Sequence, residues 1–197
     1  MSKKKIITAP HKTLRLKAKV IDELDKSVKQ FLRSLQQTLV AQEKPAAAGL
    51  ALPQIDLSYR AFATYLETPV STHPQARIFV NPVIIDLSDV LSVGPDRKSP
   101  DLEGCLSIPE LYGPVARPEW VTMEFMEVLN PGEDDIQLSD PKQETFYDFP
   151  GRVMQHELDH LNGILFTDYT LKQGQPLFRQ EKNDLLPVDP MVVKAWS

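Results

Sequence analysis

The sequence His156-Glu157-Leu158-Asp159-His160 has the form H-E-x-x-H and is the most informative stretch of the chain. Positions i and i+4 lie on one face of an α-helix, so His156 and His160 can bind one metal ion together. Glu157 follows the first histidine, where it can act as a base on a metal-bound water molecule. The alternative is an exposed, charged helix face on which the spacing is accidental. We interpret the motif as a helix that carries a hydrolytic metal site.

The residues on either side of the motif predict where its helix begins and ends. Pro150 suits a first turn, where its missing N–H costs no hydrogen bond. Asn162 and Gly163 are typical of a helix that ends in the left-handed conformation. Apolar residues are frequent between these ends, which predicts that the helix is mostly buried.

The rest of the chain predicts one more helix and several strands. Residues 25–42 have apolar side chains at helical spacing, and Asp22 or Asp25 could cap the start of this helix. Residues 86–104 are rich in Ser, Pro, Asp and Gly and read as a long surface loop. Residues 174–197 read as a weakly patterned tail. The segments predicted as strands are 59–65, 77–85, 120–129 and 144–147.

Length and composition suit one globular domain over residues 1–197, with 174–197 as its C-terminal tail. Of the 197 residues, 42% are hydrophobic and 25% charged, as in ordinary globular proteins. The net charge of −5 argues against a nucleic-acid binder, so we expect no sequence-specific nucleic acid partner. No apolar run approaches the roughly 18 residues that span a bilayer, and the start lacks the apolar segment of a secretory signal. We therefore expect a cytoplasmic protein without a membrane partner.

Cys105 is the only cysteine and the best candidate for a third metal ligand. A catalytic zinc-type site usually has three protein ligands and one water. No histidine follows His160, and the only later glutamate, Glu181, lies in a segment without a helix signal. A thiolate binds Fe²⁺ or Zn²⁺ well, so Cys105, His156 and His160 with one open position fit a hydrolytic site. The alternative for Cys105 is a buried, unreactive thiol.

Residues 48–54, with the sequence AGLALPQ, provide a second candidate segment. Its small residues would let the backbone pass close to a ligand. The amide of Gln54 could donate a hydrogen bond to a developing oxyanion. The alternative is a plain connection between a helix and a strand.

These three segments, taken together and in order, resemble the motifs of the peptide deformylase family. Residues 103–107 match the family motif E-G-C-L-S, and residues 156–160 match H-E-x-D-H, whose aspartate distinguishes it from generic zinc proteases. The resemblance covers roughly residues 5–173 and is less complete in the first motif, G-x-G-L-A-A-x-Q. That motif is matched at Gly49, Leu50, Ala51 and Gln54 and departs at Ala47 and Leu52. The two departures bear on substrate fit and rate rather than on the type of reaction.

The resemblance implies an α+β fold in which mainly antiparallel sheets pack around a central helix carrying H-E-x-x-H. It implies a metal-dependent hydrolase that removes the N-formyl group from the formyl-methionine of nascent polypeptides and releases formate. The nascent formyl-methionyl peptides would be its partners, met at the ribosome. The implied cofactor is Fe²⁺, with Zn²⁺ or Ni²⁺ as substitutes, and a thiolate donor suits these ions.

Further residues have expected roles on this interpretation. The backbone N–H of Leu106 would stabilise the oxyanion together with Gln54. The residues expected to line the substrate pocket are Ala48, Gly49, Phe149 and Val153.

Three charged residues are expected to support the metal ligands. Glu103 and Arg117 would form an ion pair behind the ligand loop. The alternative is a surface ion pair that contributes little. Asp159 would act behind the ligands or in helix packing rather than as a ligand.

Two other functions remain open from the sequence. A zinc endopeptidase would share the H-E-x-x-H mechanism but would need a third ligand other than Cys105. A diverged deformylase-like protein would have an altered substrate or weak activity because of Ala47 and Leu52.

Overall fold

The computed structural model describes residues 3–43, 46–68, 71–93, 102–131, 135–182, 184–194 and 196. Its helical elements are η1 (Lys12–Arg15), α1 (Lys26–Val40), η2 (Leu52–Ile55), α2 (Asp148–Leu161), α3 (Phe166–Lys172) and α4 (Met191–Lys194). Its strands are β1 (Gly49–Ala51), β2 (Ala61–Thr68), β3 (Ser71–Leu87), β4 (Leu91–Ser92), β5 (Glu103–Cys105), β6 (Ile108–Gly113), β7 (Arg117–Pro118), β8 (Trp120–Glu127), β9 (Lys142–Tyr147), β10 (Leu177–Glu181) and β11 (Asp184–Val188).

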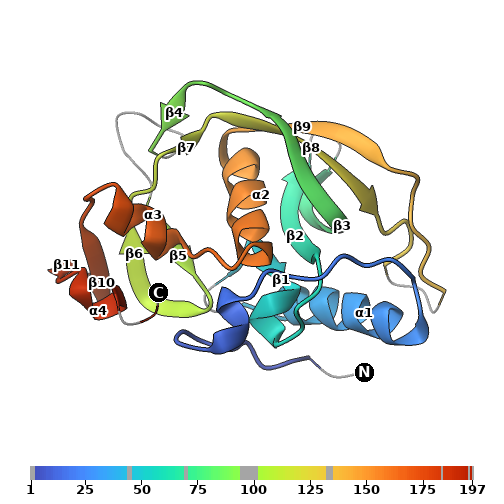
Figure 1. Ribbon diagram of the computed structural model, residues 1–197, viewed down its shortest axis with the longest axis horizontal. Helices are drawn as coiled ribbons and strands as arrows, with labels where there is room; N and C mark the ends of the chain where they lie inside the picture. The colour runs from blue at the N-terminus through green and yellow to red at the C-terminus, as the bar shows by residue number, and fades with distance from the viewer. Residues whose placement is uncertain are drawn as a thin grey trace.

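The strands form three antiparallel sheets around α2. The largest has the strand order β1-β2-β3-β8-β9, and a four-stranded sheet has the order β11-β10-β6-β5. Strands β4 and β7 form a two-stranded sheet. Figure 1 shows α2 near the centre of the molecule, with β2, β3 and β8 on one side of it and β5 and β6 on the other. The expectation of an α+β fold with antiparallel sheets around a central helix is confirmed.

The alternation of side chains in the large sheet explains why one helix lies on each of its faces. Successive residues of a strand point to opposite faces. In β2, Ala61 and Ala63 pack into the cluster that contains the buried leucines of α1. Phe62, between them, packs into the cluster that contains Met154 and Leu158 of α2. The five-stranded sheet therefore packs against α1 on one face and against α2 on the other.

The predicted helices are confirmed, with their ends close to the expected positions. Asp25 caps α1, because its Oδ1 accepts a hydrogen bond of 2.8 Å from the backbone N–H of Val28. Helix α2 begins at Asp148 with Pro150 in its first turn. It ends before Gly163, whose φ of 73° lies in the left-handed region. A Cβ at Gly163 would also lie 2.6 Å from the carbonyl oxygen of Arg15, so glycine is required there by packing as well.

The sequence prediction was less accurate for irregular segments. The tail over 174–197, which is weakly patterned in sequence, contains β10, β11 and α4 in its described part. The predicted loop over 86–104 contains β4 and the start of β5, and its residues 94–101 lie outside the described residues. Within the described ranges, the structure has no helix that is long and apolar enough to cross a membrane.

Candidate metal centre

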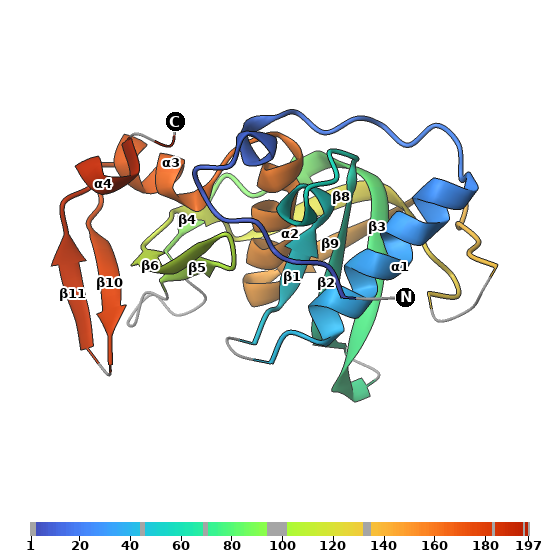
Figure 2. The ribbon, with the colours of Figure 1, turned by 90° about the horizontal axis from the view of Figure 1, so that it is seen from below.

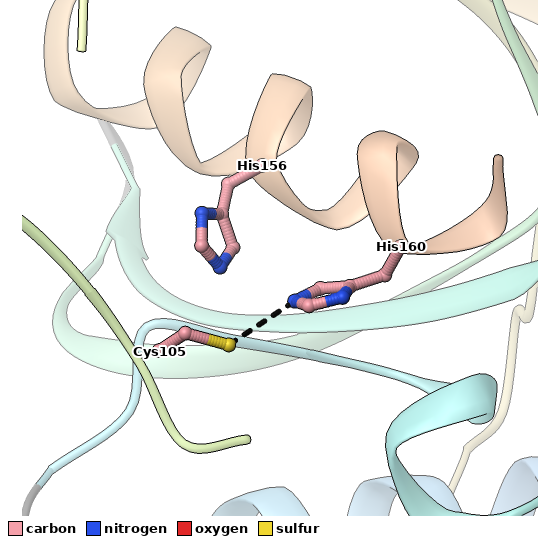
Figure 3. Close-up of side chains that lie close together, drawn as sticks. All are labelled: Cys105, His156 and His160. Atoms are coloured by element: carbon pink, nitrogen blue, oxygen red, sulfur yellow. Dashed lines mark hydrogen bonds between the residues drawn. The ribbon is translucent and has the colours of Figure 1, made fainter. Parts of the chain in front are cut away.

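Helix α2 and strand β5 bring the three predicted metal ligands together. The candidate ligand atoms of Cys105, His156 and His160 all lie within 4.8 Å of one another. The Sγ atom of Cys105 lies 3.3 Å from Nε2 of His160. Figure 3 shows both histidines on the same side of α2, directed towards the cysteine. A tetrahedral Zn²⁺ or Fe²⁺ site with usual bond lengths separates sulfur from nitrogen by about 3.5 Å, so this donor set fits such an ion.

The two ligand-bearing elements are fixed by their surroundings. Burial lowers the pKa of His160 well below its ordinary value and so keeps the imidazole neutral, as metal binding requires. Cys105 ends β5, where the pairing with β6 is irregular between Gly104 and Cys105. A Cβ at Gly104 would lie 2.7 Å from the ring of Tyr112, so only glycine lets the strand pass this close.

Glu103 is the centre of an ion-pair network directly behind the ligands. It accepts hydrogen bonds of 2.6 and 2.9 Å from the guanidinium of Arg117 and one of 2.9 Å from Arg152. Its Oε2 also lies 3.2 Å from Nδ1 of His156. Burial alone would raise the pKa of Glu103, but the charge and hydrogen bonds of Arg117 and His156 lower it far below its usual value. Glu103 therefore holds the His156 ring with its other nitrogen free to face the metal site.

Arg117 connects this network to the motif helix. It is 3% exposed, and its Nη1 donates a 2.8 Å hydrogen bond to Oδ2 of Asp159. The hydroxyl of Tyr169 donates to the other Asp159 oxygen over 3.1 Å. The pair of Glu103 and Arg117 is therefore buried and is not the exposed surface ion pair that the sequence left open. Asp159 faces Arg117 and Tyr169 and is not part of the Cys/His/His group.

Glu157, the predicted base, is buried beside the ligands. It is 3% exposed, and its Oε2 makes no hydrogen bond within the part of the chain that the structure describes. Burial raises the pKa of Glu157 to about 7 in the metal-free protein, and a neighbouring divalent cation would lower it again. Gly49 approaches this side chain so closely that a Cβ there would lie 2.5 Å from Oε1. A buried carboxylate with one oxygen unpaired is suited to accept a proton from a water molecule.

Gln54 is held in one orientation beside Cys105. Its Oε1 accepts a 2.7 Å hydrogen bond from the backbone N–H of Ala51. Its Nε2 is consequently directed towards Sγ of Cys105 at 3.5 Å and Oγ of Ser107 at 3.3 Å. Leu106 follows Cys105 directly, and Leu106, Cys105 and Gln54 all line one cavity. The two predicted oxyanion donors are thus placed next to the candidate ligands.

A cavity of about 910 Å³ opens onto this group of residues. All four residues predicted to contact substrate line it, together with Glu157 and His156. They are Ala48, Gly49, Phe149 and Val153. Ala47 also lines the cavity, whereas Leu52 is fully buried in the core cluster around α1. The extra bulk of Leu52 is therefore taken up by the core and does not project into the cavity.

The sequence did not identify three residues of the site. Arg152 donates to Glu103, to the carbonyl of Val115 at 2.6 Å and to that of Ser92 at 3.0 Å. It lies one helical turn before His156, and a charged residue on a buried helix was the signal that could have revealed it. Ser107 was visible only as the last letter of a matched motif, and Tyr169 gave no signal.

The arrangement of these residues by itself indicates the class of protein. Two histidines on one helix, a cysteine from a neighbouring hairpin and a buried glutamate with an unpaired oxygen form a group that suits a metal-dependent hydrolase. The sequence model of the polypeptide deformylase family matches residues 3–175. The chain belongs to the polypeptide deformylase family.

Individual relatives agree with this assignment. The peptide deformylase of Bradyrhizobium sp. (strain BTAi1) is 36% identical over 175 residues, which cover 87% of this chain and 89% of the relative. That of Pseudothermotoga lettingae is 34% identical over 165 residues, covering 84% and 81%. Among solved structures, a peptide deformylase from Synechococcus elongatus in complex with actinonin has a TM-score of 0.66 at 29% identity, covering 84% of this chain and 77% of that one. A Met-Ala-Ser-bound class I type b peptide deformylase from Acinetobacter baumannii has a TM-score of 0.67 at 27% identity, covering 85% and 98%.

Proposed function

We propose that this chain removes the N-formyl group from the formyl-methionine of nascent polypeptides and releases formate. The observation that carries the proposal is the unpaired carboxylate oxygen of Glu157 beside the Cys105, His156 and His160 group. Membership of the deformylase family supports this hydrolase activity over an endopeptidase or a diverged function. The relative from Acinetobacter baumannii binds Met-Ala-Ser, a peptide with the free methionine that deformylation would produce.

The residues of the site have separate roles in the proposed reaction. A divalent metal ion held by Cys105, His156 and His160 would lower the pKa of a water ligand and polarise the formyl carbonyl. Glu157 accepts the proton of the attacking water and passes it to the leaving amine. The side-chain amide of Gln54 and the backbone N–H of Leu106 donate hydrogen bonds to the oxygen that becomes negative. One such donor typically contributes about 3–4 kcal/mol to transition-state stabilisation.

The metal, the place of action and the organisation of the chain are further parts of the proposal. A thiolate ligand in a reducing cytoplasm suits Fe²⁺, with Zn²⁺ or Ni²⁺ as substitutes. The substrate would be met as nascent chains leave the ribosome. We treat residues 1–197 as one metallohydrolase domain, because the ligands and their support residues come from the four-stranded sheet, from the small β4–β7 sheet and from α2.

Formate release tests the proposal directly. The protein would be purified without oxygen, loaded with Fe²⁺ and mixed with formyl-Met-Ala-Ser. We expect formate from the native protein and none above background from Glu157→Gln, which keeps the side-chain volume but removes the base. Glu124→Gln on β8, a half-buried carboxylate that bonds to Gln143 and does not border the site, is the matched control and should remain active. A metal-loaded native protein that releases no formate would refute the proposed function.

A further inference from the structure

Part of the wall of the cavity comes from a segment of the chain that the family model does not match. That match ends at residue 175, and β10 begins at Leu177. Gln180 in β10 and Lys182 directly after it both line the cavity of about 910 Å³. Figure 2 shows the β10–β11 hairpin on one side of β5 and β6 and the segment leading into β1 on the other. The hairpin therefore contributes to the cavity from the side opposite Ala47 and Ala48.

The charge of Lys182 is available to a ligand. Lys182 forms no ion pair with any residue in the described ranges of the chain, and it is exposed at the mouth of the cavity. Its φ of 54° is the backbone geometry of the tight turn between the paired residues Glu181 and Asp184. Gln180 lies in β10 and Lys182 in the turn that follows it, and both side chains border the cavity.

The cavity also has room for more than formyl-methionine. Its volume lies near the upper end of the roughly 300–1,000 Å³ that is usual for small-molecule sites. A peptide bound with its formyl group at Glu157 would continue along this cavity towards the solvent. The residues after methionine would then meet the wall that Gln180 and Lys182 form.

We propose that the β10–β11 hairpin forms the distal part of the substrate groove and that Lys182 favours formylated peptides with an acidic residue beyond the methionine. The inference rests on the proposed function and specifies its substrate class. The side-chain amide of Gln180 would form a hydrogen bond with the peptide backbone. The positive charge of Lys182 would favour acidic over basic side chains of the peptide.

Glu110 is the other charged residue on this wall, and it limits where the preference can occur. The register between β6 and β10 pairs Leu111 with Arg179, so Glu110 lies beside Gln180. Lys182 lies two residues further along the hairpin. An acidic side chain should therefore be favoured only at a peptide position that reaches past Glu110 to the turn. Glu110→Gln should widen the range of positions at which acidic residues are favoured.

The test compares five-residue formylated peptides that carry Asp or Lys at the third, fourth or fifth position. For the native, metal-loaded protein we expect kcat/KM to be about two- to five-fold higher with Asp than with Lys at one of these positions, as partly exposed ion pairs produce. Lys182→Glu should reverse the ratio. Lys172→Glu makes the same charge change on α3, away from the cavity, and should leave the ratio unchanged.

The outcomes separate this inference from the proposed function. Formate release with equal rates for Asp and Lys peptides at every position, in the native protein and in Lys182→Glu, would overturn the role of Lys182 and leave deformylation intact. If no peptide is deformylated, the proposed function fails. The Kd values of the corresponding deformylated peptides, measured by calorimetry, then decide whether Lys182 still discriminates between Asp and Lys.

Discussion

Replacing Gly49 with alanine would displace the proposed base without touching a metal ligand. The new Cβ would lie 2.5 Å from Oε1 of Glu157 and 2.7 Å from its Cγ, whereas ordinary contact begins at 3.4 Å. The carboxylate must therefore move by about 0.9 Å, the difference between 3.4 and 2.5 Å. A displacement of about 1 Å at a catalytic site can lower the rate by about 10²-fold, or about 2.7 kcal/mol in activation free energy.

The assay measures kcat and KM for formate release from formyl-Met-Ala-Ser, together with the metal content of each protein. We expect kcat to fall about 100-fold in Gly49→Ala, with the metal content unchanged. Glu124→Gln on β8 again serves as the control, because its side chain bonds to Gln143 and does not border the site. A rise in KM with an unchanged kcat would instead indicate that the new methyl group obstructs substrate.

A double mutant gives the result that would refute this reasoning. If Gly49→Ala acts only through Glu157, it should cost nothing further once the base is gone, so Gly49→Ala/Glu157→Gln should equal Glu157→Gln alone. Additive losses would show that the glycine acts independently of the base. A Gly49→Ala protein with native kcat would show that the close approach in the structure is wrong.

Three further predictions concern the ligands and the ion pairs. Cys105→Ser should abolish stoichiometric metal binding measured by atomic absorption, whereas an endopeptidase that uses another third ligand would keep its metal. Arg117→Met should lower the free energy of unfolding in urea by about 3–5 kcal/mol, because Glu103 and Asp159 lose a buried partner; a loss below 1 kcal/mol would contradict the buried network. Burial alone would raise the pKa of Glu127, but hydrogen bonds from Arg77 hold it below its ordinary value. The stability of the native protein over Glu127→Gln should therefore be full above about pH 4.3 and shrink as the pH falls towards the lowered pKa. A difference in urea unfolding that stays constant or grows between pH 7 and pH 3 would contradict the lowered pKa.

The motif helix was the part of the fold most fully predictable from sequence. Its two histidines specify the i, i+4 spacing, and Pro150 and Gly163 restrict where the helix can begin and end. Both restrictions are local properties of the backbone. The structure adds the close contact of Gly163 with Arg15, which no local pattern contains.

The C-terminal hairpin shows why other elements escaped prediction. Residues Asp184–Pro187 of β11 are all exposed, so the strand has no alternation of buried and exposed side chains to detect. It forms because it pairs with β10, which itself pairs with β6 far away in the sequence. The contacts of Arg152 and Tyr169 with Glu103 and Asp159 depend likewise on how distant segments pack, so composition and spacing could not reveal them.

The origin of the three candidate ligands couples metal supply to the folded state. His156 and His160 belong to α2, which packs on the five-stranded sheet. Cys105 belongs to β5 of the four-stranded sheet. An ion held by all three would cross-link these two layers and would bind only the folded chain. Each tenfold increase of free metal above its Kd would then add about 1.4 kcal/mol to stability. A cell short of that metal would accordingly hold this protein in a less stable form that is more open to unfolding and proteolysis.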